Sequence, residues 1–187
     1  LALDVFRGAT VAGMLLVNNP GSWGAIHAPL AHAPWHGWTP TDLIFPFFLF
    51  IVGITTHLSL ASRRARGDDE RAISVQILRR GALIMLFGWI MGWFPFYPIT
   101  RFTNMRIPGV LVRIGVAYIG CALLTRRGSL KRQVGILATL LLGYWFAMTL
   151  LPVPGQGGIG ANLLDDPNRS LASWLDRLLL DGHLWKS

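Results

Sequence analysis

Long apolar segments constrain the fold of this chain more than any other feature. Five of them, separated by polar stretches, cover roughly residues 3–17, 42–60, 80–96, 107–125 and 133–151. Segments of about this length can cross the hydrocarbon core of a bilayer, where a helix satisfies its own backbone hydrogen bonds. We therefore predict an all-α fold, a polytopic transmembrane helical bundle with about five membrane-spanning helices, in contact with membrane lipid.

Composition supports a membrane protein and narrows its partners. Charged residues make up 14% of the 187 residues, against about 25% in soluble domains. The net charge of +8 would suit a nucleic-acid-binding protein, but the basic residues lie between the apolar segments. That distribution indicates membrane topology, so we expect no nucleic-acid partner. Cys121 is the sole cysteine, and because no zinc-ligand spacing occurs, we expect no metal.

The distribution of arginine and lysine predicts the orientation of the chain. Residues 61–80 and 126–132 hold most of the basic residues, whereas residues 18–41 hold none. By the positive-inside rule, the two basic stretches face the cytoplasm, and the histidine-bearing loop within residues 18–41 faces the other side. We therefore predict a multi-pass membrane protein with a cytoplasmic N-terminus.

The chain changes character after its fifth apolar segment. Pro152 and Pro154 open a glycine-rich strip, and residues 173–180 then have the pattern of a short amphipathic helix. This helix would lie on the membrane surface or pack over the non-cytoplasmic loops. We predict that residues 1–151 form a transmembrane core and residues 152–187 a non-cytoplasmic loop.

A polar, histidine-bearing loop leads directly into the second apolar segment. Thr39 is a suitable N-cap for a helix, Pro40 suits the first helical position, and Asp42 can complete a capping box. His32, His36 and Asp42 therefore lie where a membrane helix leaves the bilayer. Polar groups in that position are candidates for function.

His32 and His36 flank Trp35 in this loop. A histidine can act as a general base, or as a nucleophile that carries an acyl group. The alternative is an interfacial role, because aromatic side chains settle at the level of the lipid headgroups. Spacing alone leaves both interpretations open.

Asn18 and Arg113 are further polar residues at the ends of apolar segments. Asn18 either ends a helix or supplies an amide that orients a substrate carbonyl. Arg113 either holds an anionic group or pairs with Asp42, because a charge at membrane depth requires a partner or a cavity. Gly88 and Gly92 form a GxxxG pattern, which predicts close helix packing.

Five sequence blocks resemble, in the same order, those of the heparan-α-glucosaminide N-acetyltransferase family, whose bacterial members include membrane acyltransferases of the NagX type. The blocks are LDVFRGATVAGMLLVNNPG, LAHAPWHGWTPTDLIFPFFLFIVG, RIPGVLVRIGVAY, VPGQGGIGANL and LDRLLLDGHLW. The resemblance covers essentially the whole chain. Members of the family are longer, so we expect the chain to correspond to their N-terminal half.

The resemblance implies an enzyme of the bacterial inner membrane that moves an acetyl group from cytoplasmic acetyl-CoA to an amino sugar on the other side. The family's active-site histidine falls on His32 and the asparagine of its VN block on Asn18, so we expect both to be catalytic. Asp42, Trp35 and Arg113 match polar or aromatic positions of the same blocks, and we expect them to bind substrate. An acetyl-histidine intermediate and direct transfer both remain open, and a homodimer is a further expectation.

The alternative function is a membrane transporter of sugars or amino sugars. Such a protein would move its substrate through a cavity between the helices without acyl transfer. Transporters commonly show internal repeats and broken helices. Neither feature is evident in this sequence, which favours the acyltransferase.

Overall fold

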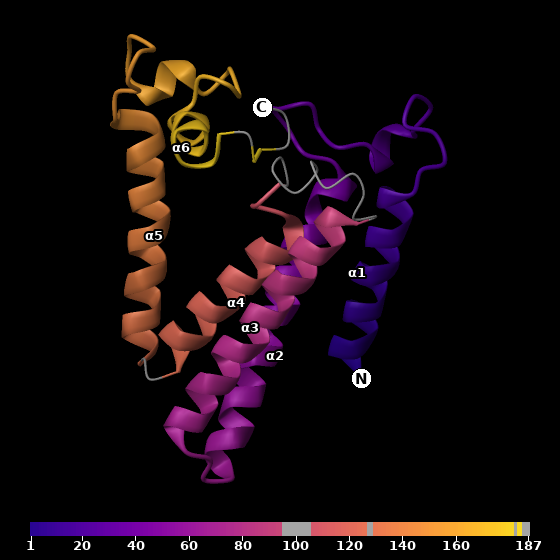
Figure 1. The fold of residues 1–187 in the computed structure, drawn as a ribbon, viewed down its shortest axis with the longest axis vertical. Coiled ribbons are helices and arrows are strands. Elements are labelled where there is room, and N and C mark those ends of the chain that lie inside the picture. The colour runs from indigo at the N-terminus through magenta and orange to yellow at the C-terminus, as the bar shows by residue number, and fades with distance from the viewer. Residues whose placement is uncertain (95–105, 127–128, 182, 185–187) are drawn as a thin grey trace. The chain divides into compact units, whose positions relative to one another are not determined.

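The structure, a computed structural model, describes residues 1–94, 106–126, 129–181 and 183–184 (Figure 1). These residues form helices and turns and contain no β-strand, which confirms the all-α prediction. In chain order the elements are α1 (Ala2–Asn18), η1 (Ala28–Leu30), α2 (Pro40–Ala65), α3 (Glu70–Trp93), α4 (Val110–Thr125), α5 (Leu130–Leu150), η3 (Gly160–Leu163) and α6 (Leu171–Leu180).

Within the described residues, α2, α3 and α5 are long and apolar enough to cross a membrane. The other two helices predicted to span, α1 and α4, have 17 and 16 residues. At 1.5 Å per residue they are about 26 and 24 Å long, slightly less than the hydrocarbon core of a typical bilayer. The helical, membrane-like class is therefore as predicted, and α1 and α4 are its two short members.

The basic stretch over residues 61–80, which we expected to be a loop between the second and third apolar segments, is mostly helical, so that expectation was wrong. Helix α2 continues to Ala65, and α3 begins at Glu70, ten residues before the predicted start. Asp69 caps α3, because its carboxylate accepts hydrogen bonds from the backbone nitrogens of Arg71 and Ala72. Hydropathy marks where a helix becomes apolar, whereas the cap marks where it begins. The predicted end of this segment, at residue 96, lies outside the described residues.

The chain divides into two compact units, Leu1–Arg66 and Gly67–Ser187, and each is described by itself. In the first unit α1 packs against α2. The rings of Phe6 and Phe47 have centroids 5.6 Å apart, and Gly13 lies beside the side chain of Ile44. Residue numbers rise on α1 as they fall on α2, so the two helices are antiparallel. The predicted division between a transmembrane core (residues 1–151) and a non-cytoplasmic loop (residues 152–187) concerns location relative to the membrane. It stays a prediction.

In the second unit, α3 and α4 approach closely at glycines. A Cβ added to Gly88 would lie 2.9 Å from the Cβ of Leu111, so the predicted packing role is confirmed for this glycine. A Cβ added to Gly115 would lie 2.9 Å from the carbonyl oxygen of Gly81. The GxxxG pattern did not predict this second contact, because Gly81 and Gly115 lie on different helices. Gly92 is exposed.

Candidate functional site

The first turn of α2 builds the candidate site. Thr39 is the N-cap, Pro40 occupies the first helical position, and Thr39 and Asp42 form a capping box, as predicted. Oδ2 of Asp42 accepts a hydrogen bond of 2.9 Å from the backbone nitrogen of Thr39. The same oxygen accepts one of 3.2 Å from the backbone nitrogen of Ala33. Oδ2 of Asp42 therefore connects the start of α2 to the loop that precedes it.

The other oxygen of Asp42 holds His32. Nδ1 of His32 lies 2.6 Å from Oδ1 of Asp42. An ionised carboxylate can only accept hydrogen bonds. Nδ1 of His32 therefore carries a hydrogen and donates the hydrogen bond to Oδ1. Nε2 then carries a lone pair, and the His32 side chain is 68% exposed. The arrangement presents an oriented imidazole base or nucleophile that is backed by a negative charge.

The loop on the N-terminal side of His32 is tied to the same helix start. The hydroxyl of Thr39 donates to the carbonyl of Ala31 at 2.7 Å. The hydroxyl of Thr41, a residue only 4% exposed, donates to the carbonyl of Pro29 at 3.1 Å. With the bond from Ala33 to Asp42, the backbone is fixed on both sides of His32. The position of this exposed side chain is therefore set by the loop rather than by burial.

Asn18 belongs to the first unit and lies near the start of α2, as His32 does. It is the last residue of α1, and the antiparallel pairing of α1 with α2 brings this helix end to the start of α2. Its side-chain amide donates to the carbonyl of Met14 at 2.8 Å, which suits the interpretation as a helix end. An amide NH₂ has two hydrogens, so this bond leaves a second donor on Asn18. Both interpretations of Asn18 remain compatible with the geometry.

Trp35 and His36 are exposed and contact each other. Their rings meet edge to face, with centroids 6.4 Å apart. His32 holds the carboxylate of Asp42 through its ring nitrogen. The geometry thus provides an orienting carboxylate for His32, which spacing alone could not show. The substrate-binding role of Trp35 stays a prediction.

Arg113 belongs to the second unit, where it lies in the first turn of α4. Partial burial, and then the charge of Arg113, lower the pKa of the Arg106 guanidinium below its usual value. The two guanidinium groups therefore lie close enough to repel each other. Arg106 was not among the site residues predicted from sequence. The predicted pairing of Arg113 with Asp42 stays a prediction.

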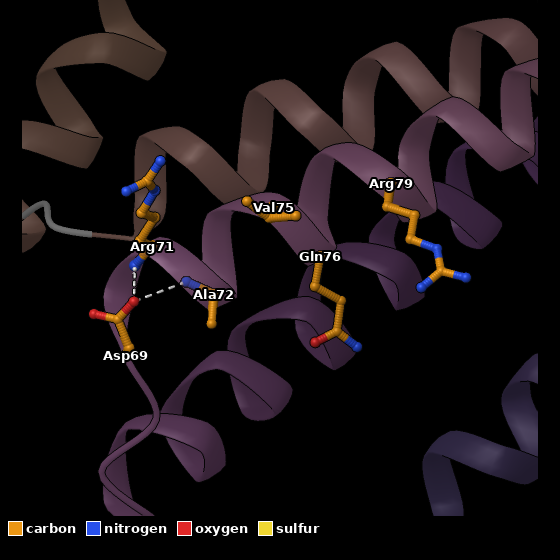
Figure 2. Close-up of a pocket in the computed structure, with 6 residues that line it drawn as sticks. All are labelled: Asp69, Arg71, Ala72, Val75, Gln76 and Arg79. Atoms are coloured by element: carbon orange, nitrogen blue, oxygen red, sulfur yellow. Dashed lines mark hydrogen bonds between the residues drawn. The ribbon is translucent and has the colours of Figure 1, made fainter.

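A further basic region lies at the N-terminal end of α3. A pocket of about 560 Å³ is lined by Asp69, Arg71, Ala72, Val75, Gln76 and Arg79. Figure 2 shows these six residues. Arg80, the next residue along α3, instead places its guanidinium 5.6 Å from the ring centroid of Tyr118. Arg71 and Arg79 are therefore the two cations of this pocket.

A family model and two curated proteins are similar to this chain in sequence. The family model described as "Heparan-alpha-glucosaminide N-acetyltransferase, catalytic" matches residues 1–163. A heparan-alpha-glucosaminide N-acetyltransferase of Homo sapiens is 34% identical over 219 aligned residues, which cover 99% of this chain and 32% of that protein. The protein of the same name from Mus musculus is 33% identical over 219 residues, covering 98% of this chain and 32% of that protein. The chain thus spans about a third of the length of these curated relatives.

Proposed function

The chain belongs to the heparan-alpha-glucosaminide N-acetyltransferase family, and from this premise we propose that it supplies the acyl-transfer site of a membrane N-acetyltransferase. In this proposal an acetyl group passes from acetyl-CoA on the cytoplasmic side to an amino sugar on the opposite side. The observation that carries the proposal is the 2.6 Å contact between Nδ1 of His32 and Oδ1 of Asp42. An imidazole oriented in this way suits both steps of acyl transfer to an amine.

In direct transfer, Nε2 of His32 takes the proton of the attacking amine. The amine nitrogen forms a bond to the thioester carbonyl carbon, the carbon–sulfur bond breaks, and the imidazolium returns the proton to the CoA thiolate. Asp42 stabilises the imidazolium that forms between these two proton transfers. In the covalent route Nε2 itself attacks the carbonyl carbon, the carbon–sulfur bond breaks, and CoA leaves as the thiolate. The amine then attacks the acetyl carbon, the bond to Nε2 breaks, and the freed Nε2 takes the proton that the amine loses.

The remaining predicted residues have supporting roles in this proposal. The second N–H of Asn18 would polarise the thioester carbonyl, because the carbonyl oxygen gains negative charge during attack. Trp35 would offer an aromatic surface to the sugar acceptor. Arg113, together with Arg106, would favour an anionic group of either substrate.

We place the nucleotide of the donor at the pocket formed by Arg71 and Arg79. The phosphates of CoA are too highly charged to cross the bilayer, whereas its pantetheine arm is slim and uncharged. The phosphates must therefore remain on the cytoplasmic side, where the positive-inside rule predicts that this basic stretch lies. The arginines of the pocket offer bidentate donors of the kind that phosphate groups prefer.

Replacing Arg71 and Arg79 together with alanine should raise KM for acetyl-CoA roughly tenfold, the effect of losing charge-assisted hydrogen bonds. The value of kcat should change little, because neither side chain takes part in the chemical step. Arg132→Ala is the matched control, since Arg132 is an exposed arginine outside the pocket. An unchanged KM in the double variant would remove the pocket from the donor site.

The function itself is tested with the full-length protein reconstituted in liposomes. Radiolabelled acetyl-CoA is supplied on one side of the membrane and glucosamine on the other, and N-acetylglucosamine is measured over time. We expect labelled product on the glucosamine side, together with stoichiometric release of CoA on the donor side.

The transporter alternative predicts a different result in the same vesicles. Glucosamine would then cross the membrane unmodified, at a rate that is independent of acetyl-CoA. Uptake of this kind without acetylated product, repeated with several amino sugars, would contradict the acyltransferase.

A further inference from the structure

Helix α6 carries an apolar face that the described residues leave uncovered. Leu175, Leu178 and Leu179 are 46%, 63% and 68% exposed. Their spacing of three and four residues places them on one side of the helix. The uncovered face therefore continues over the C-terminal half of α6.

Arg177 lies opposite the leucine face and is bonded to the protein. Arg177 donates to the backbone carbonyl of Asn168 at 2.7 Å, and Asp176 is exposed beside it. Ser170 caps the helix, since its hydroxyl oxygen accepts from the backbone nitrogen of Ser173 at 3.3 Å. The helix thus has a defined start, and its one cation is held on the side away from the three exposed leucines.

The segment between α5 and α6 fixes α6 at the end of α5. The backbone nitrogen of Gly160 donates to the carbonyl of Leu151 at 3.0 Å. Gly160 also packs so closely on the backbone of Met148 that no Cβ would fit. Val153 and Leu163 are each 3% exposed, and they form a small core within this segment. Helix α6 follows directly and contacts α5.

The length of α5 sets the level at which α6 lies. Helix α5 has 21 residues, or about 31 Å at 1.5 Å per residue, which matches a hydrocarbon core of about 30 Å. Its C-terminal end at Leu150 therefore falls at the boundary between acyl chains and headgroups. Figure 1 shows α6, in yellow, nearly end-on beside this end of the orange α5, which runs along the page. Helix α6 therefore lies across α5, along the plane of a membrane that α5 would cross.

We propose that α6 is an interfacial helix that lies in the headgroup region at the C-terminal end of α5, with its leucine face against the acyl chains. A lipid surface suits this face for two reasons. The face has no charged residue, and it belongs to a helix that contacts α5, a long apolar helix with no buried residue. Amphipathic helices with these properties bind at the boundary between headgroups and acyl chains. The proposal requires α5 to span the membrane, and it is independent of the acyl-transfer chemistry.

The test measures what surrounds each side of α6. A nitroxide label is attached in turn to Leu178→Cys and to Asp176→Cys, in the full-length protein with its native cysteines, Cys121 among them, replaced by serine. The protein is placed in phospholipid nanodiscs, and collisions of the label with oxygen and with a water-soluble nickel chelate are measured. Both sites are exposed, so neither label should disturb the fold.

We expect the label at position 178 to collide severalfold more with oxygen, which concentrates in the acyl chains, than with the nickel chelate. The label at position 176, on the polar side, should show the reverse preference. Access of the nickel chelate at position 178 would overturn the proposal in favour of an exposed aqueous helix. Protection of position 178 from both reagents would overturn it in favour of a protein segment packed on the leucine face.

Discussion

Replacing His32 with alanine is expected to lower acetyl transfer by about 10²–10⁴-fold, the usual contribution of a positioned general base. The structure orients the imidazole of His32 through its 2.6 Å bond to Asp42. Its side chain is 68% exposed, so the substitution removes little packing and the protein should still fold. The measurement is the rate of acetylation of glucosamine by purified full-length protein, with acetyl-CoA saturating.

His36→Ala is the matched control for this prediction. His36 lies four residues away in the same loop and is also exposed, but Asp42 holds His32 through its Oδ1. The loss of the His36 side chain should change the rate of acetyl transfer by no more than a few-fold. Transfer that survives in His32→Ala would remove this residue from the chemistry, whatever the effect of His36→Ala.

The same variant separates the two chemical routes. The protein is mixed with radiolabelled acetyl-CoA in the absence of an acceptor and quenched rapidly. Covalent label that appears in wild type and is absent from His32→Ala would assign an acetyl-imidazole intermediate. Turnover without any label bound to the protein would assign direct transfer, with His32 as the base.

Several features of the site could be predicted from sequence because they depend on local chemistry. The start of α2 follows from Thr39, Pro40 and Asp42, whose side chains act on backbone groups within one helical turn. The end of α1 likewise follows from the sequence around Asn18. Such features need no knowledge of how distant segments pack, so the sequence predicts them well.

The bond between His32 and Asp42 could not be predicted in the same way. The two residues are ten positions apart, and they meet because the loop folds back on the start of α2. This return depends on bonds from Thr39 to Ala31 and from Thr41 to Pro29, which join side chains to backbone atoms across the loop. A useful signal was nevertheless present: a capping carboxylate has a second oxygen, which remains available to another donor.

The start of α3 illustrates a different limit. Its N-terminal turns carry Arg71 and Arg79, so hydropathy places them in a loop, although arginine is a good helix former. Asp69 supplies the missing signal, because an aspartate at the N-cap satisfies backbone groups that the first turn leaves unpaired. A search for caps, and not only for apolar length, would have placed the start of this helix correctly.

Replacing Asp42 with asparagine should separate the two tasks of this side chain. The amide oxygen of asparagine can still accept from the backbone nitrogen of Thr39, so the cap of α2 persists and the melting temperature should stay close to that of wild type. The amide NH₂ then faces Nδ1 of His32 and donates to it, which moves the imidazole proton to Nε2 and removes the lone pair needed for catalysis.

The expected result for Asp42→Asn is a fall in kcat of about 10²–10⁴-fold, by analogy with the wrong tautomer in catalytic triads. KM for acetyl-CoA should remain nearly unchanged, because in our proposal the donor phosphates bind at the pocket of Arg71 and Arg79. Asp4→Asn is the matched control, since Asp4 also lies in the first turn of a helix of the same unit but pairs with Arg7. A kcat close to that of wild type in Asp42→Asn would show that the carboxylate serves only as a helix cap. A loss of kcat at unchanged melting temperature would instead assign it to positioning His32, because a residue that merely stabilises the fold would lower both together.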